Sequence, residues 1–295
     1  MPVDGPAGAA VPGDNSTPGA RAPVRAGRNL PAALGVGLAM GGLALVTLFT
    51  VKATFLLYLA ALGGVALWEL SRAFSARDIR LPLVPVAAGG AAALALAYWR
   101  GERALVACLA LTVIAILAWR LPGGVDGYLR DVTAGVFVLA YLPLMGGFVA
   151  LMLAAPDGGR RVLIFIILAV CSDIGGYFTG ILIGRHLMVP MISPKKTWEG
   201  FAGSALACLV AGGVALPLLL HGAVWEGLLL GGAAVLAATL GDLAASMSKR
   251  DLGIKDWGAL LPGHGGVLDR LDSLLISAPV VWLLLLLFVP VASHH

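Results

Sequence analysis

The sequence predicts an all-α, polytopic integral membrane protein with about nine transmembrane helices. Among its 295 residues 59% are hydrophobic and 12% are charged, whereas a typical soluble domain carries about 25% charged residues. The apolar residues form long continuous runs. Such runs indicate helices, because membrane β-strands alternate apolar and polar residues.

Nine runs approach the roughly 20 apolar residues that a helix needs to cross the hydrocarbon. They cover residues 30–50, 53–71, 82–99, 103–119, 132–155, 161–184, 200–220, 223–247 and 271–291. Only a short break at Lys52 separates the first two runs.

The first 28 residues have a different composition, rich in Pro, Gly, Ala and polar groups. Such a segment cannot bury an apolar core, so residues 1–28 are expected to form a disordered N-terminal head. We divide the remainder into an N-terminal transmembrane region, residues 29–160, and a C-terminal transmembrane catalytic region, residues 161–295, which holds the polar motifs.

Most Lys and Arg residues fall on one side of the predicted membrane. With the N-terminus inside, the cytoplasmic segments hold Arg21, Arg25, Arg28, Arg72, Arg77, Arg80, Arg120, Arg130, Arg185, Lys195, Lys196, Lys249, Arg250, Lys255 and Arg270. The positive-inside rule therefore places the N-terminus in the cytoplasm of a multi-pass protein of the cell (plasma) membrane. The net charge of +4 follows this topology and does not indicate binding to nucleic acid.

Two carboxylates lie where the membrane makes them costly. Asp173 falls in the sixth predicted span and Asp242 near the end of the eighth, and a charge there is tolerated only if paired, hydrated or bound to a cation. Asp242, Ser246 and Lys249 also share one helix face. For Glu69, at the end of the second span, a functional role and the simpler role of an acid that reaches the membrane surface fit the sequence equally well.

The charged loop from Lys249 to Asp272 holds four Asp residues between two apolar spans. Asp269 and Asp272 would share a face if a helix begins near Leu268. Gly265 and Gly266 follow His264 and allow close approach of the backbone to a ligand. Basic groups for phosphates come from Lys249, Arg250, Lys255 and Arg270. A basic loop held by lipid headgroups would explain the cations but not the interleaved acids, so the loop predicts a phosphoryl- or nucleotidyl-transfer site.

A second polar segment, SPKKTWEG, runs from Ser193 to Gly200. Thr197 and Glu199 stand where a helix begins and backbone N–H groups are free, and Lys195 or Lys196 beside that end would suit a phosphate. Taken alone, the segment is better explained by ordinary helix capping with an interfacial Trp anchor. The predicted topology, however, places it on the same membrane face as the charged loop, which favours a joint site.

The stretch SMSKRDLGIKDWGALLPGHGGVLDRLD, from Ser246 to Asp272, resembles the signature of the phosphatidate cytidylyltransferase family. That signature runs Ser-x-x-Lys-Arg, then Lys-Asp, Pro-x-His-Gly-Gly and Asp-Arg-x-Asp, and this sequence meets every fixed position. DIGGYFTG from Asp173 and SPKKTWEG from Ser193 are similar to upstream blocks of the family. Two departures are Ser248, where the family usually has an apolar residue, and Lys195, where it usually has a small one.

The resemblance implies a reaction in phospholipid biosynthesis, in which CMP passes from CTP to phosphatidic acid and CDP-diacylglycerol and pyrophosphate form. It implies Mg²⁺ held by Asp242 and Asp269, with Asp173 as a further candidate, and leaves a second cation open. Phosphate-binding or catalytic roles fall to Lys249, Arg250, Lys255, His264 and Arg270. Substrate-binding roles fall to Ser193, Lys195, Lys196, Thr197, Glu199, Ser246, Gly265 and Gly266. A homodimer is expected from the resemblance and from small residues at helix-packing spacing, such as Gly176, Gly180 and Gly184.

Two other functions fit a polytopic chain with acids in its spans. An ion-coupled transporter would place acids near the membrane centre in paired half-repeats, but the sequence contains no evident repeat. A CDP-alcohol phosphotransferase would carry an aspartate-rich motif of the DxxDG…GxxxDxxxD type, which the sequence lacks. The isolated cysteines Cys108, Cys171 and Cys208 have no ligand spacing and are expected to be buried apolar residues.

Overall fold

The computed structural model describes residues 30–258, 260 and 265–290. The predicted head, residues 1–28, and His264 lie outside the described residues. In chain order the elements are α1 (Leu30–Thr50), α2 (Lys52–Ser75), α3 (Leu83–Arg100), α4 (Glu102–Arg120), the 3₁₀ turn η1 (Leu121–Gly123), α5 (Tyr128–Leu139), the π-helical η2 (Ala140–Leu144), α6 (Met145–Ala154), α7 (Gly158–Ile183), β1 (Leu187–Val189), β2 (Ser193–Thr197), α8 (Trp198–Leu220), α9 (Val224–Asp251) and α10 (Leu268–Phe288).

The helices confirm the predicted all-α membrane architecture. Within the described residues, eight helical stretches have the length and composition to cross a membrane, and Gly35–Thr50 of α1 adds a shorter apolar one. One of the eight, Tyr128–Ala154, joins α5, η2 and α6 without a break. The break predicted at Lys52 is present, because Val51 is extended and separates α1 from α2. Lys52 Nζ donates to the Ala155 carbonyl in the turn before α7.

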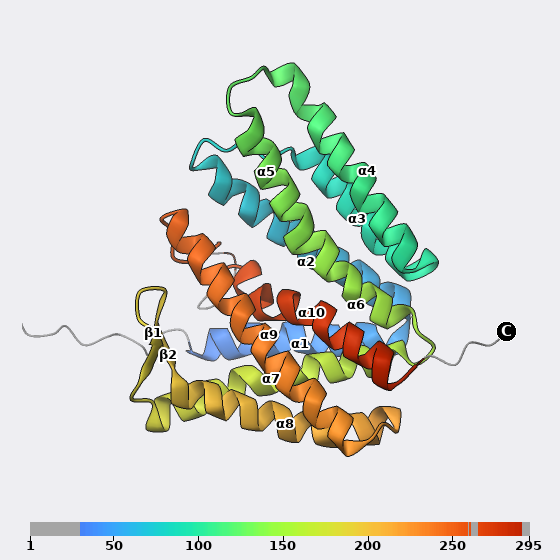
Figure 1. Ribbon diagram of the computed structural model, residues 1–295, viewed down its shortest axis with the longest axis vertical. Coiled ribbons are helices and arrows are strands. Elements are labelled where there is room, and N and C mark those ends of the chain that lie inside the picture. Colours follow the sequence, from blue (N-terminus) through green and yellow to red (C-terminus); the bar gives the residue numbers. More distant parts are fainter. Residues whose placement is uncertain (1–29, 259, 261–264, 291–295) are drawn as a thin grey trace, which may run out of the picture.

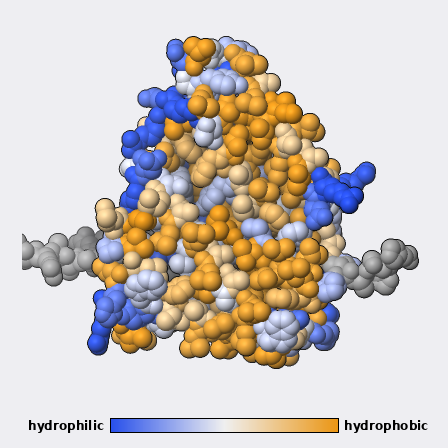
Figure 2. Space-filling view, in the orientation of Figure 1, coloured by the Kyte–Doolittle hydropathy of each residue, from blue (hydrophilic) through white to orange (hydrophobic). Residues whose placement is uncertain are grey.

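The C-terminal helices form a compact group in which α7 packs on α8, α8 on α9 and α9 on α10. Helix α10 also packs on α6, and α6 on α3, so the N-terminal helices lie against this group (Figure 1). On the face in Figure 2 most of the surface is hydrophobic, with hydrophilic residues gathered at the left and right margins. A hydrophobic belt between two polar margins is the surface that a bilayer requires.

Two apolar clusters hold the helices together. One runs between α7–α10 and the N-terminal helices, with Leu153, Leu168 and Leu285 fully buried. The other joins α2–α5 to the α9–α10 loop, and Leu70 and Leu268 are its fully buried members at that junction. The second cluster matters for the site, because it fixes the start of α10 against the N-terminal region.

Small residues bring α7 and α8 into backbone contact. A Cβ on Gly175 would meet the carbonyl oxygen of Gly203 at 2.7 Å, and one on Gly176 would meet Ser204 Oγ at 2.5 Å. A side chain at Gly175 would clash with the backbone of α8, and one at Gly176 would displace the Ser204 hydroxyl. The predicted small-residue contact at Gly176 is therefore made within the chain.

Between α7 and α8 the chain forms a small antiparallel hairpin that the sequence did not predict. Strands β1 and β2 pair with Leu187 opposite Thr197 and Val189 opposite Ser193. The hairpin projects from one end of the bundle (Figure 1), and it carries Lys195 and Lys196 of the second polar segment.

Candidate active site

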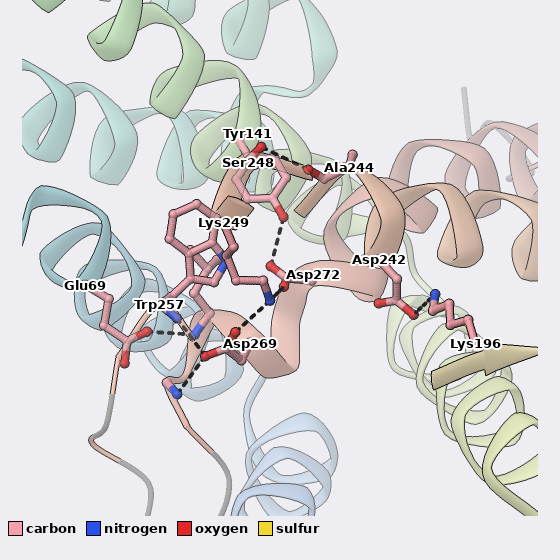
Figure 3. A network of polar contacts seen from close by, with 12 residues as sticks. Glu69, Tyr141, Lys196, Asp242, Ala244, Ser248, Lys249, Trp257, Asp269 and Asp272 are labelled. Carbon is pink, nitrogen blue, oxygen red and sulfur yellow. Dashed lines mark hydrogen bonds and ion pairs between the residues drawn. The ribbon is translucent and has the colours of Figure 1, made fainter. Parts of the chain in front are cut away.

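The end of α9 and the start of α10 meet through a buried ion-pair network (Figure 3). Lys249 Nζ lies 2.8 Å from Asp269 Oδ1 and 3.1 Å from Asp272 Oδ2. The side chains of Asp269 and Asp272 are 7% and 5% exposed, so these charges are largely shielded from water. The predicted i, i+3 pair of acids on α10 does share one face, and Lys249 is the cation that pairs with both.

The second oxygen of Asp269 organises the loop that precedes α10. Asp269 Oδ2 accepts hydrogen bonds from the backbone N–H groups of Trp257, at 3.0 Å, and Gly266, at 2.9 Å. Gly265 has a φ of +81°, a conformation that L side chains rarely adopt. The glycine pair therefore lets the chain turn tightly enough for its backbone to bind the carboxylate.

Two residues of the N-terminal region complete the network, and the sequence did not place either of them there. Tyr141, in the π-helical η2, donates from its hydroxyl to Asp272 Oδ1 at 2.9 Å. Glu69, on α2, accepts hydrogen bonds from the backbone N–H groups of Val267 and Leu268. Glu69 is 1% exposed, which overturns its reading as an acid at the membrane surface. Its position inside an apolar helix was the one signal that could have found it.

The hairpin brings Lys196 to the second predicted acid. Lys196 Nζ lies 2.8 Å from Asp242 Oδ2, and both side chains remain about one-third exposed. Thr197 caps α8 by accepting a hydrogen bond from the Gly200 N–H at 3.1 Å. The second polar segment therefore meets α9 at Asp242, before the charged loop begins at Lys249.

Two polar cavities adjoin this contact and share the carboxylates of Asp173 and Asp242. One, of about 180 Å³, lies under the hairpin and is also lined by Lys195, Lys196 and Thr197. The other, of about 420 Å³, opens between α7, α9 and α10 and is lined by residues that include Asp269, Arg270 and Ser273. All three predicted metal ligands thus face a single cavity.

A large apolar cavity, of about 710 Å³, reaches the same place from inside the helices. Its walls come from α1, α2, α3, α6, α7 and α10, and Asp173 and Arg270 are among the few charged residues that line it. Because both residues also line the 420 Å³ cavity, the apolar space and the polar space meet at this pair.

The remaining predicted residues that the structure describes do not line either polar cavity. Arg250 and Lys255 are exposed at the end of α9 and in the following loop, and Ser193 and Ser246 do not line either polar cavity. Glu199 accepts hydrogen bonds from the backbone of Arg185 and His186 and pairs with the His186 ring at 2.6 Å. Glu199 thereby ties the base of the hairpin to α8.

The donors at the site suit a hard divalent cation that a substrate also helps to bind. Among the residues that the structure describes, no group of three or more His, Cys, Asp or Glu is close enough to hold a metal alone. Mg²⁺ needs no such group, because it is usually held by one or two carboxylates, water and substrate phosphates. Asp242 and Asp173, both on the shared cavity wall, fit that requirement.

Comparison with known proteins decides the family. The profile of the cytidylyltransferase family matches residues 32–288, nearly the whole chain. The chain belongs to the cytidylyltransferase family. A Mycobacterium leprae protein named phosphatidate cytidylyltransferase is 40% identical across 95% of this chain and 97% of its own length. Proteins of the same name from Mycobacterium bovis and Pseudomonas aeruginosa are 39% and 33% identical, covering 89% and 82% of this chain and 90% of each relative.

Membership confirms the resemblance drawn from the motifs and makes the chain a membrane-embedded nucleotidyltransferase. The match begins at residue 32, so the family also covers the N-terminal helices, which precede all the motifs that carry the resemblance. This extent agrees with the structure, since the N-terminal helices contact the signature stretch. Glu69 binds the backbone of Val267, and Tyr141 binds Asp272.

Proposed function

We propose that the chain transfers CMP from CTP to phosphatidic acid, with formation of CDP-diacylglycerol and release of pyrophosphate. The observation that carries this proposal is the meeting of a polar cavity and an apolar cavity at Asp173 and Arg270. An amphipathic phosphate ester needs such a junction, with its phosphate on the polar side and its acyl chains among helices. The relatives' name, phosphatidate cytidylyltransferase, agrees with that chemistry.

In the transfer, an oxygen of the lipid phosphate forms a bond to the α-phosphorus of CTP while the bond to the β-phosphate oxygen breaks. The attacking phosphate is already ionised at neutral pH, so the site needs no general base. Its task is to hold two polyanions close together. Lys195 and Lys196 on the hairpin and Arg270 on α10 line the shared cavities and supply positive charge for that purpose.

Mg²⁺ is the proposed cofactor, held by Asp242 together with Asp173 or Asp269 and completed by substrate phosphates. When bound, the ion offsets the negative charge of the triphosphate and of the departing pyrophosphate. Lys249 pairs with Asp269 at the cavity wall and with Asp272 one turn further along α10, and so fixes the position of both carboxylates. Lys196 lies within ion-pair distance of Asp242. Its ammonium group can therefore bind a phosphate that binds beside this carboxylate.

We further propose that the hairpin and the α9–α10 loop face the cytoplasm, where CTP is available, and that the enzyme is a homodimer. The concentration of Lys and Arg on these segments supports the orientation. In the dimer, apolar helix faces outside the catalytic group would form the contact.

The reaction is tested with purified protein in detergent micelles that contain phosphatidic acid, using CTP labelled at the α-phosphate. We expect the label to move into a lipid product and pyrophosphate to be released in equal amount, and neither to occur with diacylglycerol in place of phosphatidic acid. Pyrophosphate release without lipid labelling would contradict the proposal, as would transfer to diacylglycerol.

A further inference from the structure

We propose that Glu69 is a positioning residue of the active site, which holds the start of α10 so that Asp269 faces the cavity. The inference deepens the proposed function and rests on it for its kinetic readout. It assigns a role in catalysis to a residue on α2, nearly two hundred positions from the motif loop in sequence.

The first observation is the pattern of hydrogen bonds around the carboxylate. Each oxygen of Glu69 accepts one backbone N–H, Oε1 from Val267 and Oε2 from Leu268, both at 2.9 Å. These are N–H groups at the start of α10, which lack partners inside the helix. A carboxylate at this end also interacts favourably with the helix dipole.

The second observation is how closely the loop surrounds the carboxylate. A Cβ on Gly258 would lie 2.4 Å from Glu69 Oε1, and a Cβ on Gly266 would lie 2.6 Å from Oε2. Gly258 and Gly266 thus allow the backbone to lie close against this one side chain. Glu69 is 1% exposed, so its carboxyl oxygens depend on these backbone N–H groups for hydrogen bonds.

The third observation connects this contact to the reacting groups. Val267 and Leu268 stand immediately before Asp269, whose carboxylate lies on the cavity wall and pairs with Lys249. Gly266, which faces Glu69, donates its N–H to Asp269. A shift at Val267 or Leu268 would therefore move Asp269 directly. Because catalysis depends on placement to within about 1 Å, Glu69 acts on the reaction through α10 without touching substrate.

The test uses Glu69→Gln, which keeps the size of the side chain. Its amide offers one acceptor oxygen and turns an NH₂ group towards the other backbone N–H. We expect kcat to fall about tenfold or more and amide hydrogen exchange to rise over residues 265–272. The matched control is Asp131→Asn. Asp131 is also a fully buried acid of the N-terminal region, where it accepts from the Arg80 N–H and pairs with Arg120.

Asp131→Asn should lower thermal stability while leaving kcat and exchange over residues 265–272 near wild type. Glu69→Gln with wild-type kcat, or with exchange raised evenly over all helices, would overturn the inference. If the wild type makes no CDP-diacylglycerol, the proposed function fails, and exchange at residues 265–272 still decides whether Glu69 holds α10.

A second pair of variants tests the contact itself. Gly258→Ala should reduce kcat, because the added methyl group occupies the space of Glu69 Oε1. Combining it with Glu69→Asp, whose shorter side chain withdraws from that space, should recover part of the loss relative to Gly258→Ala. Losses that simply multiply in the double variant would count against a direct contact and overturn the assignment.

Discussion

Lys249 joins the end of α9 to the start of α10 through Asp269, with Nζ 2.8 Å from Oδ1. The same ammonium group reaches Asp272 at 3.1 Å, one helical turn further along α10. Three charges in the least exposed part of the site thus depend on one another. A second ion pair of the site, between Lys196 and Asp242, is about one-third exposed.

This contrast predicts different costs for removing the two lysines. Lys249→Met leaves two buried carboxylates without their cation and should lower the free energy of unfolding by about 3–5 kcal/mol. Lys196→Met breaks an exposed pair and should cost only about 0–1 kcal/mol, yet both variants should lose activity. Thermal unfolding in detergent measures the first difference and CDP-diacylglycerol formation the second. Equal shifts in melting temperature would show that burial of the Lys249 network contributes nothing.

Asp→Asn variants test the proposed metal ligands. If Asp242 binds Mg²⁺, Asp242→Asn should reduce the rate at least about 100-fold, equivalent to about 2.7 kcal/mol, and raise the Mg²⁺ concentration for half-maximal activity. Its melting temperature should stay near wild type, since Asp242 pairs with Lys196 in a contact that is about one-third exposed. Asp269→Asn should lose stability as well, because Asp269 also binds Lys249 and two backbone N–H groups. Unchanged turnover of both variants at saturating Mg²⁺ would remove these residues from the metal site.

Arg270 lies at the junction of the polar and apolar cavities. Substitutions of this residue distinguish the contribution of its charge from that of its planar geometry. If its planar guanidinium grips a phosphate through two hydrogen bonds, Arg270→Lys keeps the charge but loses the paired contact. We expect Arg270→Lys to lose much of the activity while the protein still inserts and folds. Rates and apparent CTP affinities of Arg270→Lys and Arg270→Ala measure the effect. A lysine variant close to wild type beside an inactive alanine variant would reduce Arg270 to a point charge.

Cysteine labelling tests the orientation. Met191, at the tip of the hairpin, is 94% exposed. Glu102 is the exposed first residue of α4, and the turn between α3 and α4 lies at the opposite end of the bundle from the hairpin (Figure 1). In a background without Cys108, Cys171 and Cys208, Met191→Cys should resist an impermeant thiol reagent in intact cells and react once the membrane is opened. Glu102→Cys should react in both conditions. The reverse pattern would place the site outside the cytoplasm.

The positions of the helices could be predicted from the sequence because the bilayer imposes a rule that each segment obeys separately. A span must be apolar over its whole length and satisfy its own backbone hydrogen bonds, so α2 to α10 were recognisable without knowledge of their neighbours. The same holds for the face that Asp242 and Lys249 share and for the pairing of Asp269 with Asp272 on α10, because helical periodicity fixes both.

The contacts between distant elements could not be predicted in this way. Lys196 and Asp242 are 46 residues apart, Tyr141 and Asp272 are 131 apart, and Glu69 and Val267 are 198 apart. Helical periodicity relates only residues within a few turns, and an apolar span carries little that specifies which neighbour it packs against. The family signature predicted residues for the chemistry, among them the acids and lysines of the candidate site. The packing of α2 and η2 against the start of α10 decided which residues hold these acids and lysines in position. Buried backbone and carboxyl groups must form hydrogen bonds, and only the assembled helices bring their partners within reach.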